Sequence, residues 1–251
     1  MNEQLVLGLS LKEALEKEDF FISSSNLDAV TLLGNTDRWA SGVLLLVGPK
    51  GSGKTHLSTV WSKEHKAKHV KLEAVLLEME KGLDHEFVCV EDIDIIADAE
   101  RQKKSKIEEG IFHLINSVGS RGGKLLISSS KMPNALSIGL KDLESRLQSF
   151  SKTNIKEPDD SLVMALLLKY FNDRQIYIKH SNLTYIATRI NRTYSSIYEF
   201  VNYVDHKSLV LNTKVTRPFI DAALRQMEKN CLLYTSPSPR DLSTSRMPSS
   251  A

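Results

Sequence analysis

A glycine-rich turn between an apolar run and an amphipathic stretch constrains the fold of this chain more than any other segment. Residues 43–47 read Val-Leu-Leu-Leu-Val, which is typical of a strand buried on both faces. Residues 48–55 follow as Gly-Pro-Lys-Gly-Ser-Gly-Lys-Thr, and residues 55–66 then favour a helix with Leu57, Val60 and Trp61 on one face. The strand, turn and helix together match the pattern G-x-x-x-x-G-K-[ST] in the context that it requires.

This pattern predicts a site for the phosphates of ADP or ATP. Glycines let the backbone turn its N–H groups inward, and the following helix directs its positive end toward the anion. Lys54 is expected to reach the β- and γ-phosphates, and the Thr55 hydroxyl is expected to bind Mg²⁺. The predicted nucleotide contacts of the turn are Gly48, Pro49, Lys50, Gly51, Ser52, Gly53, Lys54 and Thr55.

A second apolar run ends in two acidic residues. Residues 87–90 read Phe-Val-Cys-Val and are followed by Glu91 and Asp92. A phosphate-binding loop of this kind is normally accompanied by a strand with carboxylates at its end, for Mg²⁺ and for the attacking water. We therefore expect Glu91 to bind the metal and Asp92 to be the catalytic carboxylate. Cys89, inside the run, is interpreted as a small buried hydrophobe.

The chain alternates strands and helices up to about residue 155. Further strands are expected at 69–72 and 124–127, with a polar loop at 101–106 and an amphipathic helix that begins at Ile107. This order predicts an α/β domain with a parallel sheet covered by helices on both faces, over residues 18–155. Residues 156–230 predict a small all-helical domain. Residues 231–251, rich in Ser, Pro and Thr, are interpreted as a disordered or non-native tail.

Composition excludes several classes of protein. The net charge of +2 excludes a strongly polybasic nucleic-acid binder. The longest apolar runs are far shorter than the roughly 20 residues of a membrane span, and the first residues lack the features of a secretory signal. Two cysteines, Cys89 and Cys231, provide neither a disulfide framework nor a metal-ligand spacing. We therefore expect a cytoplasmic protein that does not bind membranes.

Several of these segments resemble the bacterial replication initiator DnaA, an AAA+ ATPase. The resemblance covers residues 18–228 and lies in the phosphate loop with its unusual His56-Leu57, in residues 108–116 and in residues 127–133. Residues 19–26 are similar to the segment that enters the nucleotide site, which implies that Asn26 lies near the adenine. The resemblance implies an AAA+ fold with a helical lid domain, and adds His56 to the nucleotide contacts.

No segment after Ala223 resembles the helix-turn-helix that reads DNA in DnaA. A DnaA-like pair of ATPase domains without this DNA reader resembles the DnaA-related regulators of the Hda type. The match is closest to their alphaproteobacterial form, including Thr216-Arg-Pro-Phe219. Residues 4–9, Gln-Leu-Val-Leu-Gly-Leu, resemble the peptide by which these regulators bind the sliding clamp, with Gly8 in place of proline. The resemblance implies a clamp-binding segment at 1–17. Its predicted contacts are Gln4, Leu5, Leu7 and Leu9, and the alternative is a frayed terminus.

Two arginines acquire expected roles from the same resemblance. Arg146 lies in a segment similar to the family's arginine-finger box, which implies a catalytic guanidinium that acts at a neighbouring subunit's phosphate. The alternative is a surface ion pair with Asp142 or Glu144. Arg192 is a candidate for the lid residue that contacts the nucleotide, although Ser195 stands at the family's arginine position and a solvated helix residue is the alternative.

Together these residues predict a regulator that promotes hydrolysis of ATP bound to DnaA. Its partners would be DnaA and the DNA polymerase III sliding clamp (β subunit), with DNA contacted mainly through the clamp and a homo-oligomer possible. Glu91 replaces the family's aspartate, so we expect weak or no intrinsic ATPase activity. The alternatives are a truncated initiator or helicase-loader ATPase that binds DNA directly, and a nucleotide-gated adaptor.

Overall fold

The computed structural model describes residues 20–82 and 85–235, which divide into two compact units. Within the described residues, the larger unit extends to Ala165 and also includes Arg192–Ser195. The smaller unit contains Leu166–Asn191 and the chain from Ser196 onward. The division falls inside a helix, whereas the sequence analysis placed it after residue 155.

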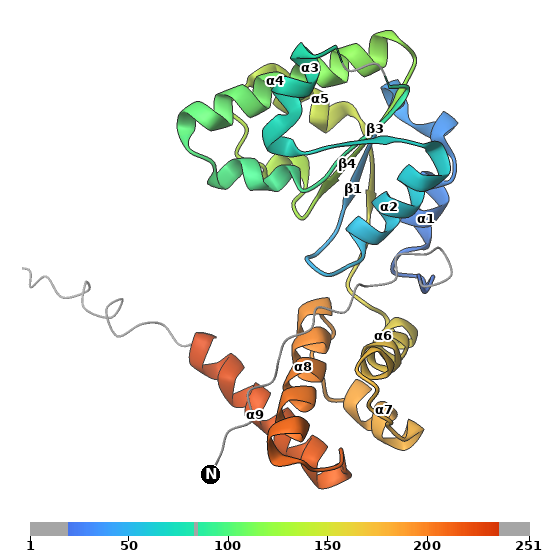
Figure 1. Ribbon diagram of the computed structural model, residues 1–251, viewed down its shortest axis with the longest axis vertical. Helices are drawn as coiled ribbons and strands as arrows, with labels where there is room; N and C mark the ends of the chain where they lie inside the picture. Colours follow the sequence, from blue (N-terminus) through green and yellow to red (C-terminus); the bar gives the residue numbers. More distant parts are fainter. Residues whose placement is uncertain (1–19, 83–84, 236–251) are drawn as a thin grey trace, which may run out of the picture. The chain divides into compact units, whose positions relative to one another are not determined.

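A five-stranded parallel sheet forms the centre of the larger unit, in the order β2-β3-β4-β1-β5. Figure 1 labels three of its strands, β3, β4 and β1. Its strands are β1 (Val43–Val47), β2 (Lys68–Val70), β3 (Phe87–Val90), β4 (Lys124–Ser129) and β5 (Ser151–Asn154). Its helices are α1 (Leu27–Leu33), α2 (Lys54–His65), α3 (Val75–Glu80), α4 (Arg101–Ser120) and α5 (Lys141–Ser149). Short 3₁₀ turns lie at Thr36–Arg38, Ala40–Gly42, Leu72–Ala74, Ile93–Asp98 and Pro133–Ala135.

Helices cover both faces of this sheet, as the alternation of elements predicted (Figure 1). Alternate residues of a strand point to opposite faces. Val88 and Val90 of β3 therefore join one hydrophobic core, which includes Ile111 of α4 and Leu147 of α5. Phe87 lies on the other face, where its ring centroid is 6.0 Å from that of Trp61 in α2.

The strands β1 and β3 have the bounds that the apolar runs predicted, but one local prediction is wrong and one strand was not predicted. Residues 101–106, expected as a loop, form the first turns of α4, with their charged side chains largely on its exposed surface. The strand β5 was not predicted, because it reads Ser-Lys-Thr-Asn and only its threonine is buried. It lies at the sheet edge beside β1, where a polar strand is tolerated.

The helical unit is built from the later part of α6 (Asp160–Asp173), from α7 (His180–Ala187), from α8 (Tyr194–Leu211) beyond its first two residues, and from α9 (Arg217–Thr235). Phe171, Ile186, Phe200 and Ile220 are completely buried and provide its core. The last helix continues past residue 230, where the sequence analysis placed the start of the tail. Within the residues described, none of the helices combines the length and apolar character needed to cross a membrane.

Two glycines of α4 provide a matched test of its packing. A Cβ on Gly110 would lie 2.7 Å from Val75 Cγ1 and 2.9 Å from the Leu76 backbone nitrogen, whereas a Cβ on Gly119 meets nothing within 4 Å. We expect Gly110→Ala to lower the free energy of unfolding by about 1–3 kcal/mol through overpacking. Gly119→Ala should leave it unchanged or raise it by about 0.5–1 kcal/mol. Urea unfolding of both variants tests this difference, and equal stability would contradict the close α3–α4 contact.

Candidate functional site

The phosphate loop between β1 and α2 has the backbone conformation that its glycines predicted. Gly51 and Gly53 have φ angles of +82° and +88°, in the left-handed region that disfavours other residues. The Gly48 amide donates to the Ser129 carbonyl of β4 at 3.1 Å, which fixes the start of the loop to the sheet. Because α2 begins at Lys54, its first N–H groups are directed into the loop without intrahelical partners.

Neighbouring groups leave no space for larger residues at two of these glycines. A Cβ on Gly48 would lie 2.7 Å from the Ser52 hydroxyl oxygen and 3.0 Å from Ile155 Cβ. A Cβ on Gly53 would lie 2.8 Å from the Phe20 ring. The loop is therefore a close-packed cradle, and its glycines are required by space as well as by conformation.

Lys54 is buried, and its ammonium is bound by the loop itself. Its Nζ donates to the carbonyls of Gly48 at 3.0 Å and Pro49 at 3.2 Å. Burial lowers the pKa of Lys54, while the nearby carboxylates of Asp92 and Asp94 act in the opposite direction. A buried cation at the start of a helix favours the binding of an anion, because the hydrogen-bond partners of Lys54 Nζ are only neutral carbonyls.

The carboxylates after β3 lie within electrostatic range of this lysine. Glu91 is half-buried, and its Oε1 is buried without a hydrogen-bond partner among the described residues. Burial, reinforced by the neighbouring charge of Asp92, raises the pKa of Glu91. Asp92 has a left-handed backbone with φ of 54°, and its amide donates to the Ser128 hydroxyl at 3.0 Å.

Asp94 is a further carboxylate near Lys54 that the sequence analysis did not select. It accepts hydrogen bonds from the Ser130 amide at 2.7 Å and from the Ser130 hydroxyl. These bonds lower the pKa of Asp94 although burial acts to raise it, so the group stays ionised. The end of β3 is thereby linked to the polar end of β4, at the carboxyl edge of the sheet.

The segment before α1 reaches the phosphate loop through a residue that sequence reasoning missed. Phe20 packs on Gly53, and its ring centroid lies 5.4 Å from that of His56, which is buried. Asn26 is also buried, but its amide group bonds within the segment: it donates to the Phe21 carbonyl at 3.0 Å and accepts from Ser23 at 2.9 Å. A role for Asn26 at an adenine stays a prediction, and the observed role is to shape the segment.

Arg192 belongs to the same compact unit as the loop, but its guanidinium is paired. Its Nη2 lies 2.9 Å from Asp160 Oδ1, and both side chains are exposed. Tyr194, two residues after Arg192, is buried. Its hydroxyl donates to the Lys156 carbonyl at 3.1 Å, and its side chain packs against Gly51. Tyr194 is a second neighbour of the loop that the sequence analysis missed, because nothing in its spacing indicates this contact.

The remaining predicted residues lie on the exposed side of the loop, away from the loop, or outside the described residues. Thr55 and Lys50 are exposed at the loop, in reach of solvent. Arg146 is an exposed residue of α5, with its guanidinium carbon 5.0 Å from the centroid of the Phe112 ring. Gln4, Leu5, Leu7 and Leu9 lie outside the described residues.

The described residues fit a nucleotide with Mg²⁺. The cradle excludes a Cβ at Gly48 and Gly53, the buried Lys54 holds only carbonyls, and Glu91 carries a buried oxygen with no partner. Lys54 and the loop amides would hold the phosphates, and Thr55 and Glu91 have the oxygen ligands that Mg²⁺ prefers. When bound, the metal would neutralise phosphate charge.

Comparisons with known proteins identify relatives over most of the chain. A family model described as the bacterial DnaA ATPase domain matches residues 11–155. An uncharacterized protein of Haemophilus influenzae is 28% identical over 237 residues, which covers 89% of this chain and 99% of that protein.

Two solved structures have the same fold. Domain III of the Thermotoga maritima initiator DnaA has a TM-score of 0.66 at 17% identity, over 87% of this chain and 98% of that one. A DnaA structure bound to AMPPCP and single-stranded DNA has a TM-score of 0.59 at 17% identity, over 76% and 64%.

Two lysines of the phosphate loop provide the test of the site. We expect Lys54→Ala to weaken ADP or ATP binding about 10-fold or more, because hydrogen bonds to charged groups contribute about 1.5–3 kcal/mol. Lys50→Ala is the matched control and should bind normally, because the exposed Lys50 is expected to contribute through its backbone. Calorimetric titration of both variants measures the effect. Unchanged affinity in a folded Lys54→Ala protein would refute the nucleotide site.

Proposed function

The chain belongs to the bacterial DnaA ATPase family, and from this premise we propose that it is a regulator of the Hda type. In this proposal it acts in the cytoplasm, together with the DNA-loaded sliding clamp, and promotes hydrolysis of ATP bound to DnaA. It thereby limits replication initiation. Its own loop holds ADP or ATP with Mg²⁺, and its contribution to the reaction is an arginine.

The observation that carries this proposal is the environment of Arg146. The guanidinium is exposed and lies against the ring of Phe112. Among the ion pairs of the described residues, none joins Arg146 to Asp142 or Glu144. A cavity of about 380 Å³ adjoins it, lined also by residues of α4 and the end of α5. The alternative of a surface ion pair is thus disfavoured, and the cation is accessible to an external anion.

A buried carboxylate holds the start of α5, the helix that carries Arg146. Glu108 of α4 is 3% exposed and accepts hydrogen bonds from the amides of Gly139 and Leu140, both at 2.9 Å. A carboxylate at the beginning of a helix also interacts favourably with its dipole. This anchor supports a fixed placement of Arg146, which a residue acting on a partner's phosphate requires.

At the γ-phosphate of a neighbouring DnaA, Arg146 would stabilise charge that develops as the phosphoryl group transfers. Such an arginine contributes about 10³–10⁵ in rate in related reactions. The planar guanidinium can donate two parallel hydrogen bonds to phosphate oxygens, which an ammonium cannot. The chain's own nucleotide would be held with little turnover, because Glu91 offers its carboxylate from a longer side chain than aspartate.

A second candidate function is an initiator or helicase-loader ATPase that binds DNA directly. It is favoured by the complete phosphate loop with Glu91, Asp92 and Asp94 around Lys54, an arrangement suited to intrinsic hydrolysis. It requires ATP turnover and DNA binding by this chain alone. The proposed regulator, in contrast, requires DnaA and the clamp for ATP turnover and for association with DNA. A homo-oligomer is compatible with either function.

Substitution of Arg146 tests the proposed role. We expect Arg146→Ala to retain nucleotide and clamp binding but to lose stimulation of DnaA's ATP hydrolysis, and Arg146→Lys to restore little. Lys141→Ala, which removes another exposed cation from the same helix, is the control and should stimulate normally. ATP turnover is measured with DnaA, clamp and primed DNA, beside the melting temperature of each variant. Full stimulation by a folded Arg146→Ala protein would end this assignment.

The N-terminal segment is tested separately. Simultaneous change of Gln4, Leu5 and Leu7 to Ala should abolish clamp binding, because an extended peptide binds through its side-chain pockets. The double variant Asn2→Ala, Glu3→Ala is the neighbouring control and should still bind. Pull-down with immobilised clamp distinguishes them, and retention of the triple variant would dispose of the clamp interaction.

A further inference from the structure

A second group of ligating side chains lies on the α2 face of the sheet, beside the nucleotide site. His69 of β2 is the direct partner of Cys89 in the parallel β2–β3 pairing. Glu91 is two residues beyond Cys89, so the two side chains point to the same face. Phe87, on that face as well, stacks with His65 of α2 at 4.8 Å between ring centroids.

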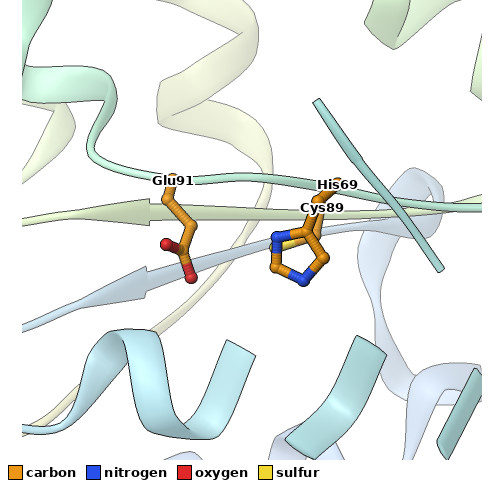
Figure 2. Close-up of side chains that lie close together, drawn as sticks. All are labelled: His69, Cys89 and Glu91. Carbon is orange, nitrogen blue, oxygen red and sulfur yellow. The ribbon is translucent and has the colours of Figure 1, made fainter. Parts of the chain in front are cut away.

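The donor atoms of His69, Cys89 and Glu91 all lie within 4.8 Å of one another. Figure 2 shows the imidazole beside Cys89 and the Glu91 carboxylate farther along the same face. Around a tetrahedral metal with bonds of about 2.0–2.3 Å, ligand atoms are about 3.5 Å apart. Small rotations of the exposed His69 and of Glu91 would therefore bring the three atoms to coordination distance.

The polar atoms at this position are incompletely satisfied. Glu91 Oε1 is buried without a hydrogen-bond partner among the described residues, and the hydroxyls of Ser58 and Ser62 in α2 lie beside Cys89 and Glu91 on this face. Cys89 is completely buried, and the exposed His69 gives access from solvent. Buried polar atoms without partners are costly, and a bound cation would satisfy the carboxylate oxygen directly.

We propose that His69, Cys89 and Glu91 bind one divalent metal ion of the zinc class. Nitrogen, sulfur and oxygen donors together suit Zn²⁺, whereas Mg²⁺ and Ca²⁺ select oxygen ligands alone. Binding transfers the thiol proton of Cys89 to solvent, His69 coordinates as the neutral imidazole, and water completes the fourth position. The three ligands tie β2 to the acidic end of β3.

This site shares Glu91 with the proposed Mg²⁺–nucleotide site, so the two would be coupled, and this coupling rests on the proposed function. One carboxylate held by zinc is lost to Mg²⁺, and zinc should therefore weaken Mg²⁺-dependent nucleotide binding. By linkage, Mg²⁺–nucleotide should weaken zinc binding by the same factor. Zinc binding itself requires no nucleotide, so it is tested independently.

The test uses the full chain, reduced and freed of metal by a chelator, and titrated with Co²⁺ as a spectroscopic substitute for Zn²⁺. We expect one equivalent of Co²⁺ to produce a thiolate-to-cobalt charge-transfer band, which Zn²⁺ then abolishes by displacement. Cys89→Ala should remove the band. His69→Ala, at an exposed position that spares the core, should weaken Co²⁺ binding about 10-fold or more. Cys231→Ala, which removes the other cysteine, should behave as wild type.

Three results would overturn the proposal: no charge-transfer band in the wild-type chain, a band that persists in Cys89→Ala, or a band that depends on Cys231. Circular dichroism of each variant checks folding. If Cys89→Ala fails to fold, His69→Ala decides, and wild-type affinity in that variant refutes the site. Failure of nucleotide binding in Lys54→Ala leaves these outcomes unaffected, because Lys54 is not a ligand.

Discussion

The phosphate loop between β1 and α2 is the constraint on which the rest of the larger unit depends. It turns the chain through left-handed conformations at Gly51 and Gly53 and buries the charge of Lys54 against carbonyls of the same loop. This arrangement requires an interior strand whose ends are fixed, and β1 has β4 and β5 as parallel neighbours. The carboxyl ends of these strands meet at one edge, which brings Glu91 and Asp94 into the electrostatic range of the lysine.

The two faces of the sheet have different roles. One face packs aliphatic side chains of β1, β3 and β4 against α4 and α5, and supports the helix that carries Arg146. The other face, under α2, carries aromatic rings at one end of β3 and polar groups at the other. Buried polar atoms without a partner among the described residues therefore gather near the nucleotide site, where ligands can satisfy them.

Sequence patterns predicted the central strands because buried parallel strands are continuous apolar runs, as at Val43–Val47 and Phe87–Val90. They did not predict β5, because a strand at a sheet edge needs few apolar residues. The beginning of α4 was misread as a loop because its charged residues face solvent. Among site residues, the loop and its acidic partners follow from local spacing. Phe20, Tyr194 and Asp94 act through contacts between distant segments, which spacing does not encode.

We propose that hydrolysis occurs on the nucleotide of a neighbouring DnaA and not on the chain's own. The most direct measurement loads labelled ATP on DnaA alone and follows a single turnover to ADP as this chain, the clamp and primed DNA are added. We expect the rate constant for the labelled nucleotide to rise with the concentration of this chain and to saturate. A rate constant that stays at the value for DnaA alone, while this chain hydrolyses its own ATP and binds DNA directly, would contradict hydrolysis on the neighbour's nucleotide.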